Sequence, residues 1–249
     1  MKMRVLAWPI LAVVVGWGSW VYTQQAARQD PAATVLRVRQ TEDFAVNGMG
    51  DSPTWAKAEW EPLHPRVADG RPYATRVKML YSRTGLYVLM DAEDRTITAT
   101  MSEDFLDLWN EDVFEFFLWP DERYTVYFEY EISPLGFELP ILIPNFGGEF
   151  LGWRPWHYDG KRKTQKATTV AGGPKQSGAS VTGWKAEVFV PYALLKPLQN
   201  VPPQPGTRWR ANFYRVDYDD GKSKSSSWDW ARVGSGFHEF NKFGTLIFE

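Results

Sequence analysis

The chain has 249 residues and a formal net charge of −2, from 28 lysines and arginines against 30 aspartates and glutamates. This balance gives no electrostatic basis for binding nucleic acid or an anionic membrane surface. The absence of cysteine excludes disulfides, thiolate zinc sites, a thiol nucleophile and a lipid-modified cysteine anchor. The 13 tryptophans, 11 tyrosines and 15 phenylalanines favour strands and aromatic cores, and leave some tryptophans over for ligand contact.

Residues 1–30 are predicted to be an export signal or a membrane anchor with a short tether. Lys2 and Arg4 give a positive start, and residues 5–22 form an uncharged apolar run. No A-x-A cleavage site follows, and about 18 apolar residues are just enough to span a bilayer, so cleavage stays open. Membrane contact is expected for this segment alone. The remaining domain, residues 31–249, is therefore expected outside the cytoplasm: periplasmic, membrane-anchored or secreted.

The first part of this domain shows strand signals. Residues 76–82 and 86–92 predict a hairpin across Arg83-Thr84-Gly85, and residues 96–100 are short and β-branched. Residues 102–108 suit one or two helical turns.

The stretch DLWNEDVFEFFLWPDERYTVYFEYEISPLG, residues 107–136, alternates with a period of two and predicts a second hairpin. Phe114 and Phe116 fall on one apolar face, and Glu115 falls on the opposite face. Glu129 and Glu131 share a face, where we expect them to be solvated.

The elements that follow repeat this pattern. Strands are expected at 137–143, 165–170, 184–190, 209–218 and 243–248, with a short helix started by proline at 191–195. No long amphipathic helix, repeat or domain linker is evident. The fold class predicted is all-β: one antiparallel β-sandwich, jelly-roll-like, of roughly ten strands.

Catalytic motifs are mostly missing. HEFNK at 238–242 lacks the second histidine of a zinc motif, and a three-histidine site would need His64, His157 and His238 to converge. A glycosidase needs two carboxyl groups about 5–9 Å apart. Asp112 and Glu115 lie three apart on a strand and face opposite sides, so they cannot form such a pair. We therefore expect no enzyme.

One acidic loop leaves metal binding open. The sequence DYDDG contains Asp217, Asp219 and Asp220, which suit calcium but also an ordinary turn. No cofactor is certain on this basis, and the metal ligands remain unknown.

Sugar binding suits the aromatic clusters better. The axial C–H groups of a sugar ring pack on a tryptophan face, while its hydroxyls need charged or amide neighbours. LWNED at 108–112 and SSSWDWARVG at 225–234 both offer this combination.

The succession LYSRTGLYVLMDAED, LWNEDVFEFFLWP, YFEYEISPLG, WKAEVFVPYALL, WRANFYRVDY, SWDW and FHEFNKFGTLIF resembles the family 9 carbohydrate-binding modules and their family 9-like relatives. The resemblance covers about residues 50–249. It implies a non-catalytic jelly-roll sandwich, often with structural calcium, and a slot that clamps a sugar between two tryptophans. Characterised members favour reducing-end sugars of cellulose and xylan chains.

The resemblance also implies site residues. Trp109 resembles the first clamp tryptophan, Glu115 a hydroxyl-binding acid and Arg215 the ligand-binding arginine. Trp228 or Trp230 resembles the second clamp, and the choice stays open. The chain departs from the family in the long aromatic insertion at 145–163, which could cover or reshape the slot, and at Phe240, where the family usually has proline.

Two other functions are kept. Cytochrome domains of the DOMON type have a related sandwich and hold haem b, for which Met79 or Met90 could pair with His157 or His238. The third is an envelope interaction module that binds neither sugar nor haem. Neither a protein partner nor the oligomeric state can be named from the sequence.

Overall fold

The computed structural model describes residues 34–67, 71–146, 149–156, 158–219 and 224–249, all within one unit that spans Ala33–Glu249. The predicted export segment lies outside these ranges, so the boundary between residues 30 and 31 stays a prediction. Within the described ranges, no helix combines the length and the apolar character needed to cross a bilayer.

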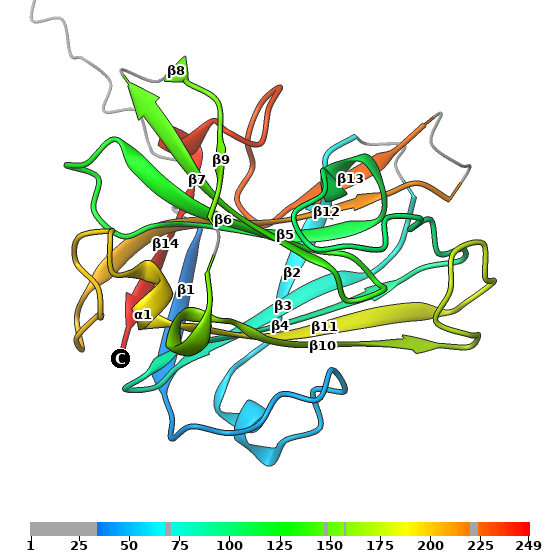
Figure 1. Ribbon diagram of the computed structural model, residues 1–249, viewed down its shortest axis with the longest axis horizontal. Helices are drawn as coiled ribbons and strands as arrows, with labels where there is room; N and C mark the ends of the chain where they lie inside the picture. The colour runs from blue at the N-terminus through cyan, green and yellow to red at the C-terminus, as the bar shows by residue number, and fades with distance from the viewer. Residues whose placement is uncertain (1–33, 68–70, 147–148, 157, 220–223) are drawn as a thin grey trace, which may run out of the picture. The chain divides into compact units, whose positions relative to one another are not determined.

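Strands dominate the described backbone (Figure 1). In chain order they are β1 (Val35–Gln40), β2 (Glu61–Pro65), β3 (Thr75–Tyr81), β4 (Gly85–Glu93), β5 (Val113–Trp119), β6 (Val126–Ile132), β7 (Glu138–Phe146), β8 (Glu149–Phe150), β9 (Arg154–Pro155), β10 (Gln165–Ala171), β11 (Gly183–Pro191), β12 (Arg208–Asp217), β13 (Ser226–Asp229) and β14 (Gly244–Phe248). Helical structure is limited to α1 (Tyr192–Leu195) and the 3₁₀ turns η1 (Pro53–Lys57), η2 (Leu108–Asn110), η3 (Gly160–Arg162) and η4 (Phe240–Lys242).

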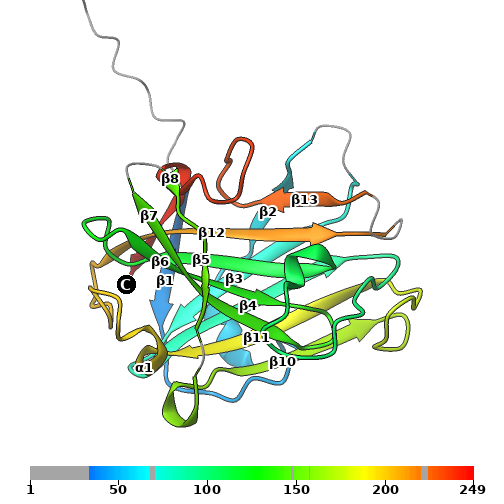
Figure 2. The same ribbon diagram turned by 45° about the horizontal axis from the view of Figure 1, so that its top comes forward.

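The strands form two packed layers that are joined through β1 and also through the pairing of β2 with β13. Hydrogen bonds run in the order β10-β11-β4-β3-β1-β14-β12-β5-β6-β7-β8, and β1 connects the layer that ends at β3 to the layer that begins at β14 (Figure 2). Strand β1 pairs in parallel with both β14 and β3, whereas the other named pairs are antiparallel. The predicted all-β sandwich is confirmed, with this parallel seam as an addition.

Alternation along β5 separates its two faces as predicted. Phe114 and Phe116 point between the layers and are fully buried, and the Phe114 ring stacks on Trp184 of β11 at 3.7 Å between centroids. Glu115 points the other way. In the β5–β6 hairpin, which the sequence also predicts, Glu115 stands directly opposite Glu131.

A second apolar cluster covers the outer face of the β14-β12-β5-β6-β7 layer. Phe117, Tyr127 and Tyr214 supply it from the strands, while Leu108 and Phe240 supply it from the turns η2 and η4. These turns thus lie over part of the sheet face that alternation alone would leave to solvent. The turns and loops therefore surround a groove on this outer face, and the groove is the candidate site.

Several local predictions need correction. Residues 96–100 form no strand, and only Thr96 makes a bridge, to Ser180. The segment is instead held by side chains, since the Thr98 amide donates to the Asp112 carboxylate at 2.6 Å. Residues 102–107 form no helix, and a single 3₁₀ turn, η2, begins at Leu108. Strands β1, β2 and β13 were not anticipated, whereas α1 follows Pro191 as expected.

Candidate functional site

A groove of about 490 Å³ opens on the outer face of the β14-β12-β5-β6-β7 layer. Its floor comes from the outward side chains of β5 and β6, and its walls come from the turns and loops around them. The lining residues are Arg66, Trp109, Glu115, Glu129, Glu131, Ile143, Phe150, Trp153, Val216, Tyr218, Ser225, Ser227, Ser235, Gly236, Phe237 and His238.

Trp109 forms one wall because its neighbour anchors the turn. Leu108 is fully buried in the outer apolar cluster, so the next residue of η2 is turned toward the groove. The Tyr218 hydroxyl donates to the Trp109 carbonyl at 3.2 Å and ties this turn to the loop after β12. Trp109 is thereby presented half-buried, as a stacking surface needs to be. The predicted ligand-binding tryptophan does line the groove.

The aromatic insertion supplies a second wall. Trp153 stands edge-on to Trp109, with 5.4 Å between ring centroids and 71° between planes, and 37 % of it is exposed. Phe150 stacks on His238 at 4.2 Å. Residues 145–163 therefore contribute to the groove wall through Phe150 and Trp153, two residues that the sequence analysis did not name. Their clue in the sequence was the aromatic content of residues 145–163.

Three glutamates form the floor. Glu115, Glu129 and Glu131 expose only 2 %, 4 % and 0 % of their surface, so the expectation that Glu129 and Glu131 are solvated is wrong. The walls described above shield the strand face on which they lie. Burial raises the pKa of Glu115 to about 8 and raises those of Glu129 and Glu131 well above the ordinary glutamate value. Neighbouring carboxylates raise the latter two further.

The rim carries Arg66 and His238. The Arg66 guanidinium lies 4.7 Å from the centroid of Phe237 and 3.6 Å from the Asp229 carboxylate. His238 Nδ1 lies 2.7 Å from the Tyr127 hydroxyl, and burial lowers the His238 pKa to about 4. At neutral pH the histidine is therefore uncharged, and it contributes a flat ring and a hydrogen-bonding nitrogen.

The structure places Arg215, Trp228 and Trp230 elsewhere. All three are buried in the core between the layers, with exposures of 0 %, 0 % and 4 %. On β12, Arg215 is in register with Phe114, so its side chain projects from the face opposite Glu115. Its guanidinium lies 4.7 Å from the Trp228 ring.

The reason is the strand that was not anticipated. β13 pairs with both β12 and β2, and this register turns Trp228 inward. The structure thus brings Trp109 and Glu115 together in the groove, and separates from them the predicted arginine and both options for a second clamp tryptophan.

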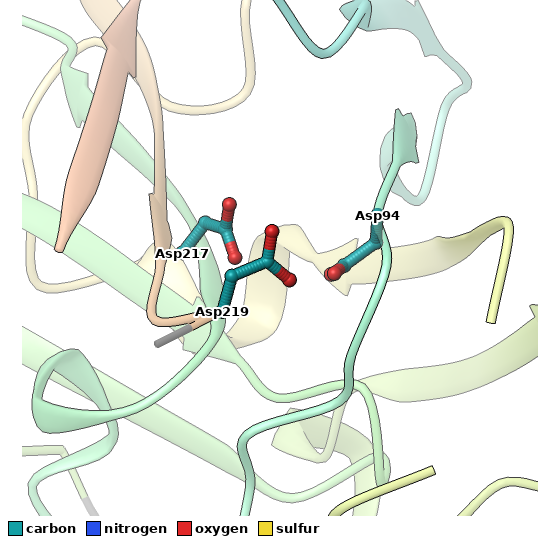
Figure 3. Close-up of side chains that lie close together, drawn as sticks. All are labelled: Asp94, Asp217 and Asp219. Carbon is teal, nitrogen blue, oxygen red and sulfur yellow. The ribbon is translucent and has the colours of Figure 1, made fainter. Parts of the chain in front are cut away.

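A second acidic cluster lies at the end of the interlayer core (Figure 3). Carboxylate oxygens of Asp94, Asp217 and Asp219 all lie within 4.8 Å of one another, and Asp94 faces the other two. Among the described residues this is the one group of three or more such side chains that converges in this way. Asp220, also named as a calcium ligand from the sequence, lies outside the described residues.

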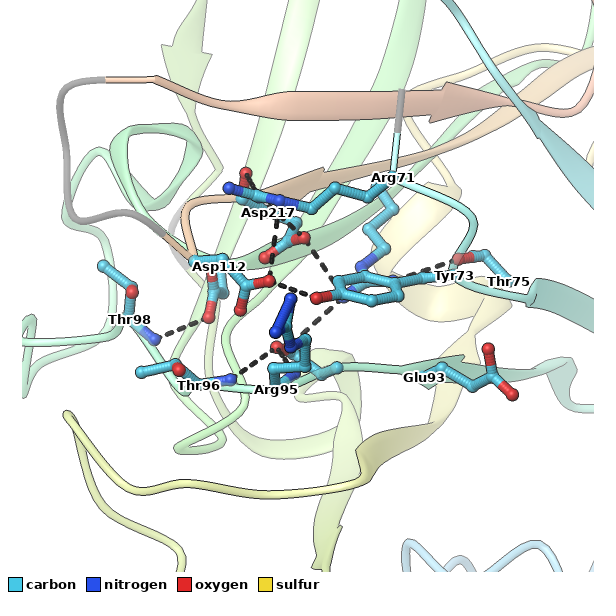
Figure 4. Close-up of polar contacts among 12 residues, drawn as sticks. Arg71, Tyr73, Thr75, Glu93, Arg95, Thr96, Thr98, Asp112 and Asp217 are labelled. Carbon is cyan, nitrogen blue, oxygen red and sulfur yellow. Dashed lines mark hydrogen bonds and ion pairs between the residues drawn. The ribbon is translucent and has the colours of Figure 1, made fainter. Parts of the chain in front are cut away.

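Arginines share this cluster (Figure 4). Arg215 lies 3.1 Å from Asp94, and Arg71 lies 3.1 Å from Asp217 and 3.5 Å from Asp219. Burial raises the pKa of Asp94 to about 6, against the opposing effect of Arg215. The cluster is therefore largely neutralised by the protein itself.

Calcium still fits the donor set. Asp217 Oδ1 and Asp219 Oδ1 are buried and have no hydrogen-bond partner, whereas Asp94 Oδ2 is ion-paired with Arg215 at 3.1 Å. Calcium takes carboxylate oxygens of this kind. A cation here would use the free oxygens and would be repelled by the two guanidinium groups, so a weak site is the physical expectation.

Asp112 has a separate, structural position. Its two oxygens accept from the amides of Thr98 at 2.6 Å and Tyr218 at 2.8 Å, which joins two loops. Glu115 lies in the groove instead. Asp112 and Glu115 thus face apart, as the strand alternation predicted.

The haem alternative loses the ligand pairs that include His238, whereas those that include His157 stay untested. Met79 and Met90 are buried between the layers, whereas His238 lies on the outer face of one layer. His157 lies outside the described residues. A methionine from the core and His238 cannot reach a common iron without crossing the sheet.

Comparison with known proteins gives a consistent result. Residues 54–248 match the model of carbohydrate-binding family 9. No curated protein matches the chain.

Solved structures with a similar fold include a presumed carbohydrate-binding protein from Bacteroides uniformis ATCC 8492, with 17 % identity and a TM-score of 0.71 over 88 % of this chain and 100 % of that one. A family 9 module from Caldicellulosiruptor kristjanssonii in complex with cellotriose has 15 % identity and a TM-score of 0.62, over 86 % of this chain and 93 % of that one. A structure of a family 9 module from the same organism with glucose has 15 % identity and a TM-score of 0.59, over 86 % and 95 %. At these identities the likeness concerns the fold alone.

Proposed function

This chain belongs to carbohydrate-binding family 9, and we propose that it binds carbohydrate, without catalysis, in the groove over β5 and β6. The observation that carries the site assignment is the meeting of Trp109 with Glu115 in one groove. Structurally similar family 9 modules have been solved with cellotriose and with glucose. The same class of ligand, a glucose-type ring or a short chain of them, suits the aromatic walls here.

The groove offers both interactions that a sugar ring needs. The ring's C–H faces would pack on Trp109 and Trp153, and its hydroxyls would bond to Glu115 at the floor and to His238 at the rim. A carboxyl group held neutral by burial can donate as well as accept a hydrogen bond. Each hydrogen bond between such uncharged groups and a sugar hydroxyl contributes about 0.5–1.5 kcal/mol.

The decisive experiment is isothermal titration of the full-length chain with glucose, cellobiose and xylobiose. Trp109→Ala removes a stacking wall and should weaken binding by about 2 kcal/mol or more, roughly 30-fold. Trp60→Ala is the matched control, because Trp60 is also a half-buried tryptophan but packs under Arg76 and Lys78 instead. Equal affinities in the two variants would reject the groove, and no heat with any sugar would reject sugar binding.

Absence of catalysis is part of the proposal and has its own test. Incubation of the chain with cellulose and xylan oligomers should release no reducing sugar, because binding here needs only stacking and hydrogen bonds. Release that depends on Glu115 would instead make the groove an active site.

We also propose that Asp94, Asp217 and Asp219 hold a structural calcium ion when calcium is present. The free buried oxygens of Asp217 and Asp219, with a carboxylate oxygen of Asp94 within 4.8 Å of both side chains, support this assignment. The ion would tie the chain just after β4 to the chain just after β12. It would lie apart from the groove, so its role would be stability.

The proposed location is outside the cytoplasm, with residues 1–30 as signal or anchor. The positive start at Lys2 and Arg4 and the apolar run after it support export. Cell fractionation with amino-terminal sequencing of the mature chain distinguishes a cleaved signal from a retained anchor. Recovery in the cytoplasm would contradict the proposal.

A further inference from the structure

The floor of the groove brings three carboxyl groups together on two neighbouring strands. Glu115 of β5 is directly opposite Glu131 of β6, and Glu129 lies two residues from Glu131 on the same face. Like charges directly opposite each other destabilise a sheet. All three side chains are more than nine-tenths buried and line the groove. Ionisation of these three carboxyl groups is therefore unfavourable unless a positively charged group lies beside them.

The protein itself provides few hydrogen bonds to these carboxyl groups. Glu115 Oε1, Glu129 Oε2 and both oxygens of Glu131 are buried without a well-formed hydrogen bond. Glu129 and the Trp109 backbone lie near enough to influence the Glu131 pKa. Burying a carboxylate without compensation is costly. Burial therefore favours the protonated form of Glu115, Glu129 and Glu131, in agreement with their raised pKa values.

The positive charge that faces the trio is small. Of the described residues that line the groove, Arg66 is the one with a fixed positive charge, and Asp229 shares it at 3.6 Å. Arg66 lowers the pKa of Glu115 only in part. His238, with Nδ1 3.8 Å from Glu129, is neutral at physiological pH. The other titratable groups facing this side are the hydroxyls of tyrosines, which carry no positive charge: Tyr127, Tyr214 and Tyr218.

A metal ion does not satisfy this geometry. Ligation needs oxygens that converge on one point, and among the described residues that convergence of three carboxylates occurs at Asp94, Asp217 and Asp219. In the groove, Glu129 and Glu131 lie within hydrogen-bonding reach of each other, but the three carboxyl groups do not meet at one point. A primary ammonium group offers three separate donors, which suits neighbouring carboxylates that do not converge.

The walls add a second requirement on the ligand. Trp109 and Trp153 present aromatic faces and edges beside the acidic floor, and Phe150 stacks on His238 near it. Aromatic faces attract both ring C–H groups and cations. A ligand that uses floor and walls together is a ring that carries a positive charge.

We propose that the carbohydrate recognised in this groove carries a protonated primary amine, as a glucosamine unit does, with the ammonium on Glu115, Glu129 and Glu131 and the ring on Trp109 and Trp153. This inference rests on the proposed function of carbohydrate binding. It narrows the ligand from sugars in general to amino sugars.

Proton transfer to solvent follows from the same geometry. At pH 6–7 a sugar amine, with a pKa near the value of about 8 for an α-amino group, is protonated. The ammonium displaces protons from the floor carboxyls, and these protons pass to the buffer. Binding is therefore expected to release protons and to weaken with added salt.

The test is isothermal titration of the full-length chain at pH 6.5 with the β-1,4-linked dimers of glucosamine, N-acetylglucosamine and glucose. Two buffers of different ionisation enthalpy report the protons released. We expect the glucosamine dimer to bind about tenfold or more tightly than the other two. N-acetylglucosamine keeps the bulk but lacks the charge, so it separates charge from shape.

Variants locate the effect. Glu131→Gln should remove most of the tenfold preference and of the proton release while glucose-dimer binding persists. Glu122→Gln, an exposed glutamate paired with Arg210, is the control and should leave both unchanged. Circular dichroism and the urea midpoint check that each variant is folded.

Each alternative outcome has a distinct meaning. Equal binding of glucosamine and glucose dimers, both abolished by Trp109→Ala, would overturn the amino-sugar inference and leave the proposed function standing. No binding of any sugar would overturn both. Heat from calcium chloride alone that disappears in Glu131→Gln would show a metal in the groove and would also overturn the inference.

Discussion

The two buried acidic clusters of this protein lie on opposite faces of the same sheet layer and are compensated in opposite ways. Between the layers, Arg215 and Arg71 approach Asp94 and Asp217 to 3.1 Å. In the groove, Glu131 and its two neighbours have no such partner. The first cluster is an internal ion-pair network. The second cluster has no cationic side chain at ion-pair distance among the described residues, apart from the neutral His238.

The difference separates stability from binding. Removing one member of a buried ion pair leaves an unpaired charge, so such networks resist substitution. Buried acids without partners cost stability while the site is empty, and strongly perturbed carboxyl groups in a cleft are typical of functional sites. Both clusters are buried, so burial alone does not distinguish a stabilising cluster from a binding site. The presence or absence of paired arginines does distinguish them. The experiments below test this contrast, starting with the largest expected effect.

Arg215→Met should be the most damaging change. It keeps much of the side-chain volume but leaves Asp94 buried without its ion-pair partner, while Asp217 keeps Arg71, and we expect a loss of about 3–5 kcal/mol of unfolding free energy. Glu131→Gln should cost nothing or stabilise the chain, since burial disfavours a charge on Glu131 and the amide is uncharged and of similar size. Urea unfolding of both variants measures this. Similar losses of unfolding free energy in Arg215→Met and Glu131→Gln would mean that the two clusters do not differ in how their charges are compensated.

The pH dependence of stability should show the groove carboxyls directly. The pKa of Glu115 rises from 4.5 to about 8 on folding. Its favourable contribution is therefore complete below pH 4.5 and is lost as the pH rises through 8. The expected loss is about 1.4 kcal/mol per pH unit within that window. Asp94 and Asp112, also raised, add to the wild-type slope.

Glu115→Gln isolates the groove's part of this slope. Urea midpoints from pH 5 to pH 8 should fall less steeply in the variant than in the wild type, while Glu122→Gln should follow the wild type. Parallel curves for wild type and Glu115→Gln would mean that Glu115 titrates normally in the folded chain.

Calcium should have a smaller effect on the other cluster. With a dissociation constant of about 0.1–1 mM, typical of extracellular sites, 1 mM calcium adds about 0.4–1.4 kcal/mol. Thermal unfolding with and without calcium measures it, and Asp219→Asn should abolish the gain. A wild-type curve that ignores calcium would mean that Arg71 and Arg215 complete the cluster by themselves.

The smallest effect on stability is expected at the groove wall. Trp153 is 37 % exposed, so Trp153→Ser should change the unfolding free energy by no more than about 0.5 kcal/mol. It should nevertheless weaken sugar binding, because it removes half of the aromatic pair with Trp109. Unchanged affinity would assign the wall to Trp109 alone.

The sequence predicted the parts of this structure that depend on local pattern. The period of two placed Phe114 inside and Glu115 outside, and the β3–β4 and β5–β6 hairpins follow from apolar runs beside turn residues. The resemblance to family 9 modules assigned Trp109 and Glu115 to one ligand site, and they lie in one groove because η2 comes shortly before β5 in the chain.

What the sequence did not reveal depends on distant segments. Glu131 looks like an ordinary outward strand residue until the turns η2 and η4 cover its face. Trp228 looks like a loop tryptophan because β13 has only four residues, and its inward direction is set by pairing with β12 and β2. Neither the covering of Glu131 nor the pairing of β13 produces a periodic pattern in the sequence around Glu131 or Trp228.

The parallel seam at β1 has a mechanical consequence. Val35–Val38 lie alongside Thr245–Phe248 of β14, and Arg39–Gln40 lie alongside Leu80–Tyr81 of β3. A pull on the chain through Val35, along the axis of β1, loads the ladders on both edges in shear, so that their hydrogen bonds share the force instead of opening one by one. If the preceding residues anchor the domain to a membrane, drag on a bound polysaccharide would reach that anchor through the strand that joins both layers.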